Sequence, residues 1–541
     1  MSGSEDQNSG RSEAGTIYGH AGTVTLFTLL SRVLGLARDL VISHRFGAGA
    51  ATDAWVQAFR IPNALRRLTA EGSMTIAFVP VYVEVRSGSG PDHGPEAARL
   101  FARRVLGLVL CSTLALAALG MVFNKELTLA FSPGFSSDPE KFALSASLLR
   151  WSFPYLVMVS FVAWAMGVLN SEGRFAAPAA APALLNTGII VFVVGLAWAF
   201  TTPIMAVAAG VLAGGAAQVV LQLPSLKATG VRPAPLGGWD SPHLKKLFGL
   251  LLPSLFGVAV YQLNLIILGI IASYLPTGQI FHYNNATRLT ELVMGLFTFA
   301  FATAGLPALS EHKARQDWGR MSATLGLTMG ATLFTVLPAL AGLVAGGEAI
   351  VSMLYLHGAF SYPDVLSTTL TLQAMALGMP AVALVRVVVP VFYAFGDART
   401  PVIVSFLTLA VTGLLGWQLS LRMQVVGLAL GLSLGTWFQC VLLLLALRGR
   451  GRPLGAWFPW RSLAMQSGAT VLMALGVWQL QGLGRWSAGP QDWLNWLVLA
   501  GFVFGGALTY LLMTLAMGES EARNWAALLG RIAGRLSGGR R

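Results

Sequence analysis

The chain has 541 residues, of which 55% are hydrophobic and 11% are charged, and its mean hydropathy is +0.67. One soluble core could not bury this much apolar surface, and too few polar residues remain to cover several cores. The composition excludes an ordinary soluble protein and indicates an integral membrane protein. We expect the net charge of +13 to reflect membrane topology, and we expect no nucleic-acid partner.

Windows of about 20 apolar residues predict an all-α polytopic membrane protein with about 14 transmembrane helices. The predicted spans are 22–46, 54–84, 102–123, 145–169, 178–200, 203–223, 244–274, 278–305, 321–345, 366–394, 401–420, 424–447, 461–482 and 490–516. Residues 1–20 are polar and rich in Gly and Ser, so we expect a disordered cytoplasmic N-terminus. The first apolar stretch is too long for the core of a cleavable signal peptide, and we expect it to remain as a span.

Lysine and arginine gather in alternate predicted loops, around 86–104, 227–246, 313–320 and 448–452. In short loops, such residues accumulate on the cytoplasmic side of the membrane, so both termini are expected in the cytoplasm. This orientation requires an even number of spans. The basic tail 518–541 fits a segment close to anionic membrane lipids.

Two pairs of short segments indicate an internal duplication. Pro80 to Glu84 resembles Pro307 to Glu311, and Glu172 to Pro178 resembles Gly396 to Pro401. In both pairs the two segments are about 225 residues apart and follow helices that are six apart in chain order. This predicts two six-helix lobes, duplicated in parallel, plus two extra C-terminal helices. Lobes of this kind usually surround a cavity with alternating access, so the pattern predicts transport.

Charged residues crowd into the first two predicted helices, which is unusual in a chain with so few charges. They are Arg32, Arg38, Asp39, Asp53, Arg60, Arg66, Arg67 and Glu71. In the second helix Asp53, Arg60 and Arg67 recur every seven residues and form one polar stripe. Pro62 lies inside the stripe, so we expect the helix to be bent or broken there.

The second half adds Arg288 and Glu291 in the eighth helix and Arg386 in the tenth. Internal ion pairs, such as Arg32 with Asp39 or Arg67 with Glu71, are the plain structural explanation for any one pair. The cations outnumber the carboxylates, however, and a charge at membrane depth is retained only beside a partner or a wet cavity. We therefore predict an anionic substrate, held by guanidinium groups through its phosphate or carboxylate oxygens.

Signatures of enzymes are scarce. The chain has no phosphate-binding loop of the G-x-x-x-x-G-K-[ST] type, and its seven histidines show no metal-ligand spacing. We predict a transporter that is not an enzyme and has no catalytic residues, metal site or cofactor. Coupling to the membrane potential or to an ion gradient stays open.

A long run of motifs resembles the MurJ (MviN) family of the multidrug/oligosaccharidyl-lipid/polysaccharide exporter superfamily. The matching segments are Ser31-Arg32-Val33-Leu34-Gly35-Leu36-Ala37-Arg38-Asp39, Phe46-Gly47-Ala48-Gly49, Thr52-Asp53-Ala54, Phe59-Arg60-Ile61-Pro62-Asn63, Leu65-Arg66-Arg67, Ala70-Glu71-Gly72 and Ala77-Phe78-Val79-Pro80. The resemblance extends over essentially the whole chain. Before Arg288 the chain departs from the family by having Asn284, Asn285 and Thr287.

The resemblance implies a flippase that moves lipid II, the undecaprenyl-diphosphate-linked peptidoglycan precursor, from the cytoplasmic to the periplasmic leaflet of the bacterial inner membrane. It implies lipid II as the substrate, with cell-wall synthesis machinery as a further candidate partner. The implied substrate-binding residues are Arg32, Arg38, Arg66, Arg288, Arg60 and Arg67, supported by the charges of Asp39, Asp53, Glu71 and Glu291. An alternative is a related undecaprenyl-linked glycan flippase or a multidrug exporter.

The expected organisation follows from the repeat and the resemblance together. Residues 21–225 form an N-lobe of helices 1–6, residues 226–450 a C-lobe of helices 7–12, and residues 518–541 the cytoplasmic tail. In the family, the last two helices form an apolar groove continuous with the cavity. The resemblance therefore implies that residues 451–517, which carry helices 13 and 14, guide the lipid tail.

Overall fold

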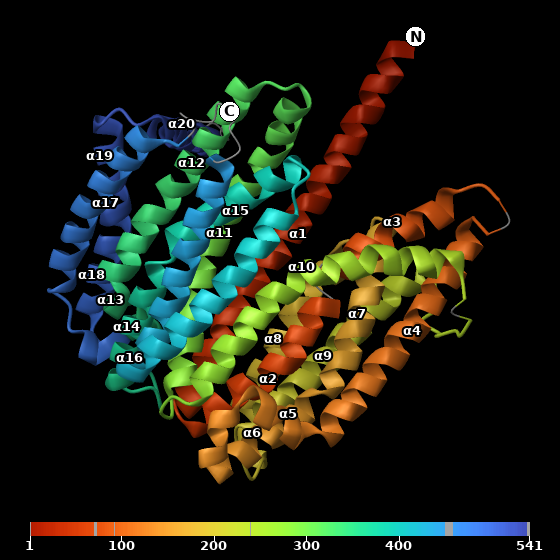
Figure 1. Ribbon diagram of the computed structural model, residues 1–541, viewed down its shortest axis with the longest axis horizontal. Coiled ribbons are helices and arrows are strands. Elements are labelled where there is room, and N and C mark those ends of the chain that lie inside the picture. The colour runs from red at the N-terminus through yellow and green to blue at the C-terminus, as the bar shows by residue number, and fades with distance from the viewer. Residues whose placement is uncertain (1, 70–72, 91, 239, 449–457, 538–541) are drawn as a thin grey trace. The chain divides into compact units, whose positions relative to one another are not determined.

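The structure is a computed structural model, which describes residues 2–69, 73–90, 92–238, 240–448 and 458–537. Every regular element in that part of the chain is helical, and Figure 1 shows the helices in order. In lipid, backbone hydrogen bonds must be satisfied within each segment, and an apolar α-helix meets this requirement. The predicted all-α class is confirmed.

The chain divides into two compact units, 1–274 and 275–541. The α-helices of the first unit are α1 (Ser2–Phe46), α2 (Ala50–Thr69), α3 (Ser73–Ser87), α4 (Pro95–Val122), α5 (Asn124–Phe131), α6 (Pro139–Ser152), α7 (Pro154–Ser171), α8 (Ala176–Leu196), α9 (Met205–Lys227) and α10 (Pro242–Ser273). Short helical turns η1 (Pro133–Ser137) and η2 (Ala197–Ala199) accompany them.

The α-helices of the second unit are α11 (Gln279–Ala314), α12 (Trp318–Ala345), α13 (Gly347–Tyr355), α14 (Tyr362–Ala376), α15 (Met379–Ala394), α16 (Arg399–Arg448), α17 (Trp460–Gln481), α18 (Trp493–Ala500), α19 (Gly506–Ala516) and α20 (Ser520–Ser537). The short turns here are η3 (Trp486–Gln491) and η4 (Gly501–Gly505). Helix α20 was not predicted from the sequence.

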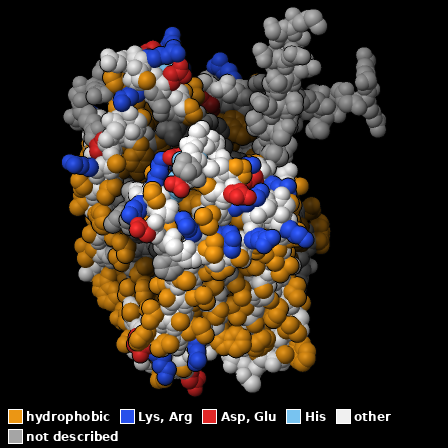
Figure 2. Space-filling view, turned by 90° about the vertical axis from the view of Figure 1, so that its right-hand side faces the viewer, with side chains coloured by type: hydrophobic (Ala, Val, Ile, Leu, Met, Phe, Trp, Pro, Cys, Tyr) orange, Lys and Arg blue, Asp and Glu red, His pale blue; other side chains and the backbone are white. Residues whose placement is uncertain are grey.

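Nine segments of the described chain are long and apolar enough to cross a membrane. One of them, α16, has 50 residues and a non-helical backbone at Gln424, so it covers two predicted spans joined by a kink. Figure 2 shows one face of the molecule, on which a broad hydrophobic band is bordered above and below by charged side chains. The chain is a multi-pass membrane protein, and the count of 14 spans is consistent with it.

The start of the chain differs from the prediction. Helix α1 begins at Ser2, so the polar residues before the first span, expected to be disordered, are helical. This stretch contains no proline that would end a helix. Extending an existing α-helix is easier than starting one, because each added residue that is fixed gains one hydrogen bond.

Two spans predicted as single helices are each divided at a proline. Pro154 is the first residue of α7, two positions after the last residue of α6, and Pro380 is the second residue of α15, shortly after α14. Proline lacks the N–H that would continue the preceding helix, so each boundary follows from the sequence. The two breaks lie at equivalent places in the two repeats.

The turns after α7 and α15 share one hydrogen-bond pattern. Gly173 has a φ of 72° and Gly396 a φ of 74°, which is the left-handed region that glycine tolerates. Arg174 N donates to Leu169 O at 2.8 Å, and Asp397 N donates to Phe392 O at 2.9 Å. This is the Schellman pattern at both ends. The sequence echo used to predict the duplication therefore corresponds to the same backbone geometry.

Helix α10 is the seventh predicted span, yet it belongs to the first compact unit. Gln57 Nε2 donates to Gly269 O at 2.7 Å, and Gly134 N donates to Ser273 Oγ at 3.0 Å. The predicted lobe boundary at 225 follows the repeat, whereas these hydrogen bonds hold α10 to α2 and η1.

Each unit has its own hydrophobic core. In the first, Phe78 and Tyr82 of α3 pack with Phe101 of α4 and with Trp164 of α7. The second unit has one cluster of α12, α15 and α16, and another in which α17 to α20 pack on α12 and α13.

Candidate functional site

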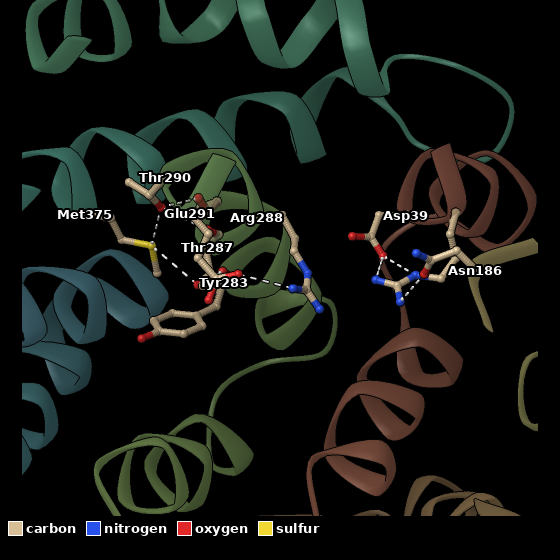
Figure 3. Close-up of polar contacts among 10 residues, drawn as sticks. Asp39, Asn186, Tyr283, Thr287, Arg288, Thr290, Glu291 and Met375 are labelled. Atoms are coloured by element: carbon tan, nitrogen blue, oxygen red, sulfur yellow. Dashed lines mark hydrogen bonds and ion pairs between the residues drawn. The ribbon is translucent and has the colours of Figure 1, made fainter. Parts of the chain in front are cut away.

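Arg38 of α1 is held by two side chains within the first unit (Figure 3). Its Nε and Nη2 donate to Asp39 Oδ1 at 2.9 and 2.7 Å, and its Nη1 donates to Asn186 Oδ1 of α8 at 3.1 Å. Asn186 Nδ2 in turn donates to Ser31 O at 3.1 Å, which fixes α8 against α1. The sequence analysis missed Asn186, because an isolated asparagine in an apolar helix carries no signal of its partner.

Arg32, also on α1, is half-buried and has no hydrogen bond or ion pair among the described residues. The sequence offered Asp39 as its partner because the two share a helix face. In the structure Asp39 pairs with Arg38 instead, since a long guanidinium side chain can reach round the helix to the next residue. Arg32 thus keeps its hydrogen-bond donors available for an anion.

The arginines of α2 are half-buried in the first unit. Arg66 Nε donates to Asn63 Oδ1 at 3.1 Å, and Arg60 Nη1 lies 3.4 Å from Leu265 O of α10. A Cβ at Gly269 would come within 1.7 Å of Arg60 Nη1, so the glycine makes room for this side chain.

Of the two expectations for Pro62, a bend or a break, the break is wrong, because α2 is a continuous helix through Pro62 and ends at Thr69. Beyond it, α3 begins at Ser73. Residues 70–72 are outside the described part of the chain, and Glu71, a predicted supporting charge, is therefore outside it as well.

Asp53, a second supporting charge, forms a buried ion pair. Lys141 Nζ lies 2.9 Å from Asp53 Oδ2, and the exposed fractions of the two side chains are 4% and 0%. The ammonium group also lies 4.5 Å from the centre of the Phe135 ring. The sequence placed Lys141 in a loop and did not connect it with Asp53, because the two are 88 residues apart.

The second unit holds its own pair in the same place. His282 Nε2 lies 3.5 Å from Asp364 Oδ1, and His282 Nδ1 lies 3.0 Å from Thr368 Oγ1. Asp53 and His282 are each the fourth residue of their helix, and Lys141 and Asp364 are each the third residue of theirs. Each repeat therefore has a polar contact between the equivalent two helices. The acid is on the first of them in one repeat (Asp53 of α2) and on the second in the other (Asp364 of α14).

Arg288 and Glu291 are neighbours on α11 in the second unit. Arg288 Nη1 donates to Glu291 Oε2 at 3.2 Å, and both side chains are more than a third exposed. Figure 3 shows Thr287 and Thr290 beside them, with their hydroxyls 3.6 and 3.9 Å from Met375 Sδ of α14. An exposed ion pair contributes little stability, so Arg288 can exchange Glu291 for another anion at small cost.

The second unit also contains a groove of about 1110 Å³. Its walls are mostly leucines, from α12, α15, the second half of α16 and α17, and Trp437 and Trp460 also line it. Arg448 stands at the end of α16. The sequence expected helices 13 and 14 to form such a groove. Helix 13, which is α17, lines it, but the other walls belong to the second repeat and none of the lining residues comes from α18 or α19.

A family model described as lipid II flippase MurJ matches residues 42–493 of the chain. A relative from Burkholderia cenocepacia, named lipid II flippase MurJ, is 34% identical over 477 residues, which are 87% of this chain and 90% of the relative. The chain belongs to the MurJ family. The resemblance stated from the motifs of the first two helices is thereby confirmed.

Solved structures agree with membership of the MurJ family. A lipid II flippase MurJ in an inward closed conformation has a TM-score of 0.76 and 25% identity, covering 91% of this chain and 97% of that one. A multidrug resistance MATE family transporter of the MOP superfamily, in an inward-facing conformation, has a TM-score of 0.67 and 13% identity, covering 81% and 98%. At that identity the second likeness concerns the fold alone.

Proposed function

We propose that this chain flips lipid II from the cytoplasmic to the periplasmic leaflet of the bacterial inner membrane. The observation that carries the proposal is the match of residues 42–493 to a family described as lipid II flippases. The half-buried arginines of α1 and α2 support it, because they suit a diphosphate that enters and leaves. Both termini lie in the cytoplasm in this proposal, and the sided distribution of Lys and Arg in the loops supports that orientation.

The headgroup is bound by Arg32, Arg38, Arg66, Arg288, Arg60 and Arg67 in this proposal. Arg32 offers its whole guanidinium group, whose planar fork fits two phosphate oxygens. Arg38 uses three of its five N–H groups on Asp39 and Asn186, which leaves two for a substrate. Asp39 orients Arg38 and Glu291 balances Arg288, whereas Asp53 pairs with Lys141.

The undecaprenyl tail lies in the groove of the second unit. Its lining residues on α16 run from Leu430 to Arg448, 18 positions apart, which corresponds to roughly 27 Å of helix. The hydrocarbon core of a bilayer is about 30 Å thick. A groove of this length suits a chain longer than one leaflet, and Arg448 at its end suits the anionic headgroup region of the bilayer.

Complementation tests the function directly. A bacterium whose own lipid II flippase is depleted should grow when it expresses this chain, and its lipid II should become accessible to a headgroup-cleaving enzyme added from the periplasmic side. The matched control is the Arg32→Ala variant, inserted at the same level, which should support neither. If the native chain inserts normally yet lipid II stays inaccessible and the cells die, the proposal fails.

A further inference from the structure

Glu519 is a fully buried carboxylate between two helices of the second unit. It follows α19 and precedes α20, at a turn where Gly518 has a φ of 76° and Glu519 N donates to Thr514 O at 3.0 Å. The turn directs the Glu519 side chain inward, whereas a carboxylate just after a final span would ordinarily face water. None of the Lys, Arg or His residues in the described part of the chain forms an ion pair with it.

Three donors from two parts of the fold satisfy this carboxylate. Oε1 accepts hydrogen bonds from Ser462 Oγ and from Gln466 Nε2 of α17, the latter at 3.1 Å. Oε2 accepts a hydrogen bond from Ala522 N at 2.9 Å and so caps α20. Hydrogen bonds to an ionised acceptor are the stronger kind, and all three partners donate.

The same network reaches α12. Gln466 is fully buried, and its Nε2 also donates to Gly330 O of α12 at 3.1 Å. The bond joins α12 and α17 along a seam. The groove walls lie directly beside this seam, because Leu463 and Ser467 follow Ser462 and Gln466 on α17, and Leu333 is one turn beyond Gly330 on α12.

We propose that Glu519 is a positioning residue for the lipid groove: its carboxylate holds Ser462 and Gln466, fixes α17 against α12, and so sets the wall on which the polyprenyl chain lies. The inference rests on the proposed function, because it concerns the groove assigned there to the tail. Glu519 itself does not line the groove. It acts through the side chains of α17.

Glutamine at this position tests the role with almost no change in volume. An amide keeps one acceptor oxygen but replaces the other with an NH₂ group, which then faces donors in place of an acceptor. One charge-assisted hydrogen bond is worth roughly tenfold to a hundredfold in an equilibrium. We expect Glu519→Gln to weaken binding of the tail by roughly tenfold.

The experiment uses the full chain in nanodiscs and two photoreactive polyprenyl diphosphate probes that carry the same headgroup. One probe has a tail of undecaprenyl length and the other a tail of one isoprene unit. The yield of crosslinking is followed against probe concentration, and the adducts are mapped by mass spectrometry. For Glu519→Gln we expect a roughly tenfold higher half-saturating concentration of the long probe and an unchanged value for the short one. General misfolding would weaken both.

Two further variants make the test decisive. Gln466→Ala removes the same bond from the side of α17 and should give the same loss, which covers the case in which Glu519→Gln does not insert. Glu521→Gln is the matched control, because Glu521 is buried two residues away and its side chain contacts Asn524 within α20. It should leave both probes unaffected.

The outcomes separate the two proposals. If the native chain binds the long probe no better than the short one, or its adducts lie outside the groove, the tail assignment fails and the role of Glu519 fails with it. If the native chain favours the long probe and both Glu519→Gln and Gln466→Ala retain that preference, the groove stands and the positioning role is overturned.

Discussion

Arg32 and Arg38 lie on the same helix and should respond differently to replacement by alanine. Arg38→Ala removes two hydrogen bonds and an ion pair from Asp39, whose side chain is only 7% exposed, and so takes a cation away from a nearly buried carboxylate. Removing one partner of a buried pair costs about 3–5 kcal/mol, and we expect about 3 kcal/mol here because Arg38 itself is 14% exposed. Arg32→Ala breaks no described bond, so its stability should change by less than about 0.5 kcal/mol.

In contrast to its small effect on stability, Arg32→Ala should strongly affect the binding of lipid II. Arg32→Ala should weaken binding by roughly tenfold to a hundredfold, the value of one lost hydrogen bond to a charged group, without loss of folded protein. Thermal unfolding of the purified protein in detergent measures the first effect, and binding of lipid II by the folded fraction measures the second.

A third variant serves as the control for this comparison. In Arg38→Ala/Asp39→Asn the buried charge is gone, so we expect the stability to recover while binding stays weak. The reasoning is refuted if Arg32→Ala unfolds as early as Arg38→Ala, or if Arg32→Ala binds lipid II as tightly as the native chain.

Three other perturbations follow from the structure. Lys141→Met should destabilise the first unit by about 3–5 kcal/mol, because it removes the cation that pairs with the buried Asp53 carboxylate, and Lys141→Met/Asp53→Leu should restore most of the loss, as thermal unfolding will show. Arg288→Lys should retain only part of the flipping activity in cells, since an ammonium group lacks the planar fork of a guanidinium. Full activity would indicate general electrostatic attraction in place of specific coordination. Burial, with a contribution from Glu519, raises the pKa of Glu521, so its ionised form is disfavoured in the folded state. Relative to Glu521→Gln, the native chain should therefore lose stability as the pH rises from about 4, with no difference at acid pH, and a constant difference would contradict this.

Much of the fold could be read from the sequence, because long apolar runs leave a membrane segment few alternatives to a helix. The two divided spans were also readable, since Pro154 and Pro380 stand at the breaks, but an apolar run does not show whether proline bends a helix or ends it. Helix α20 was missed because its arginines were interpreted as a basic tail, although nine of its 18 residues are apolar and their spacing is that of an amphipathic helix.

The sequence draws attention to the arginines of α1 and α2 as candidate site residues, but it does not give their partners. Helical spacing paired Arg32 with Asp39, whereas the structure pairs Asp39 with Arg38, because spacing describes where Cα–Cβ bonds point and not how far a long side chain reaches. Asn186, Lys141 and Glu519 became visible only when distant segments were brought together.

The polar contacts of Asp53 with Lys141 and of His282 with Asp364 have a consequence for assembly. After a duplication, equivalent helices of the two repeats are close enough in shape to compete for the same neighbour while the chain inserts. An exchange here would place Asp53 against Asp364, so that two carboxylates would meet in place of the two present pairs. Like charges that meet in this way act against the wrong partner. Because acid and base are on opposite helices in the two repeats, pairing of a helix with the equivalent neighbour from the other repeat is disfavoured.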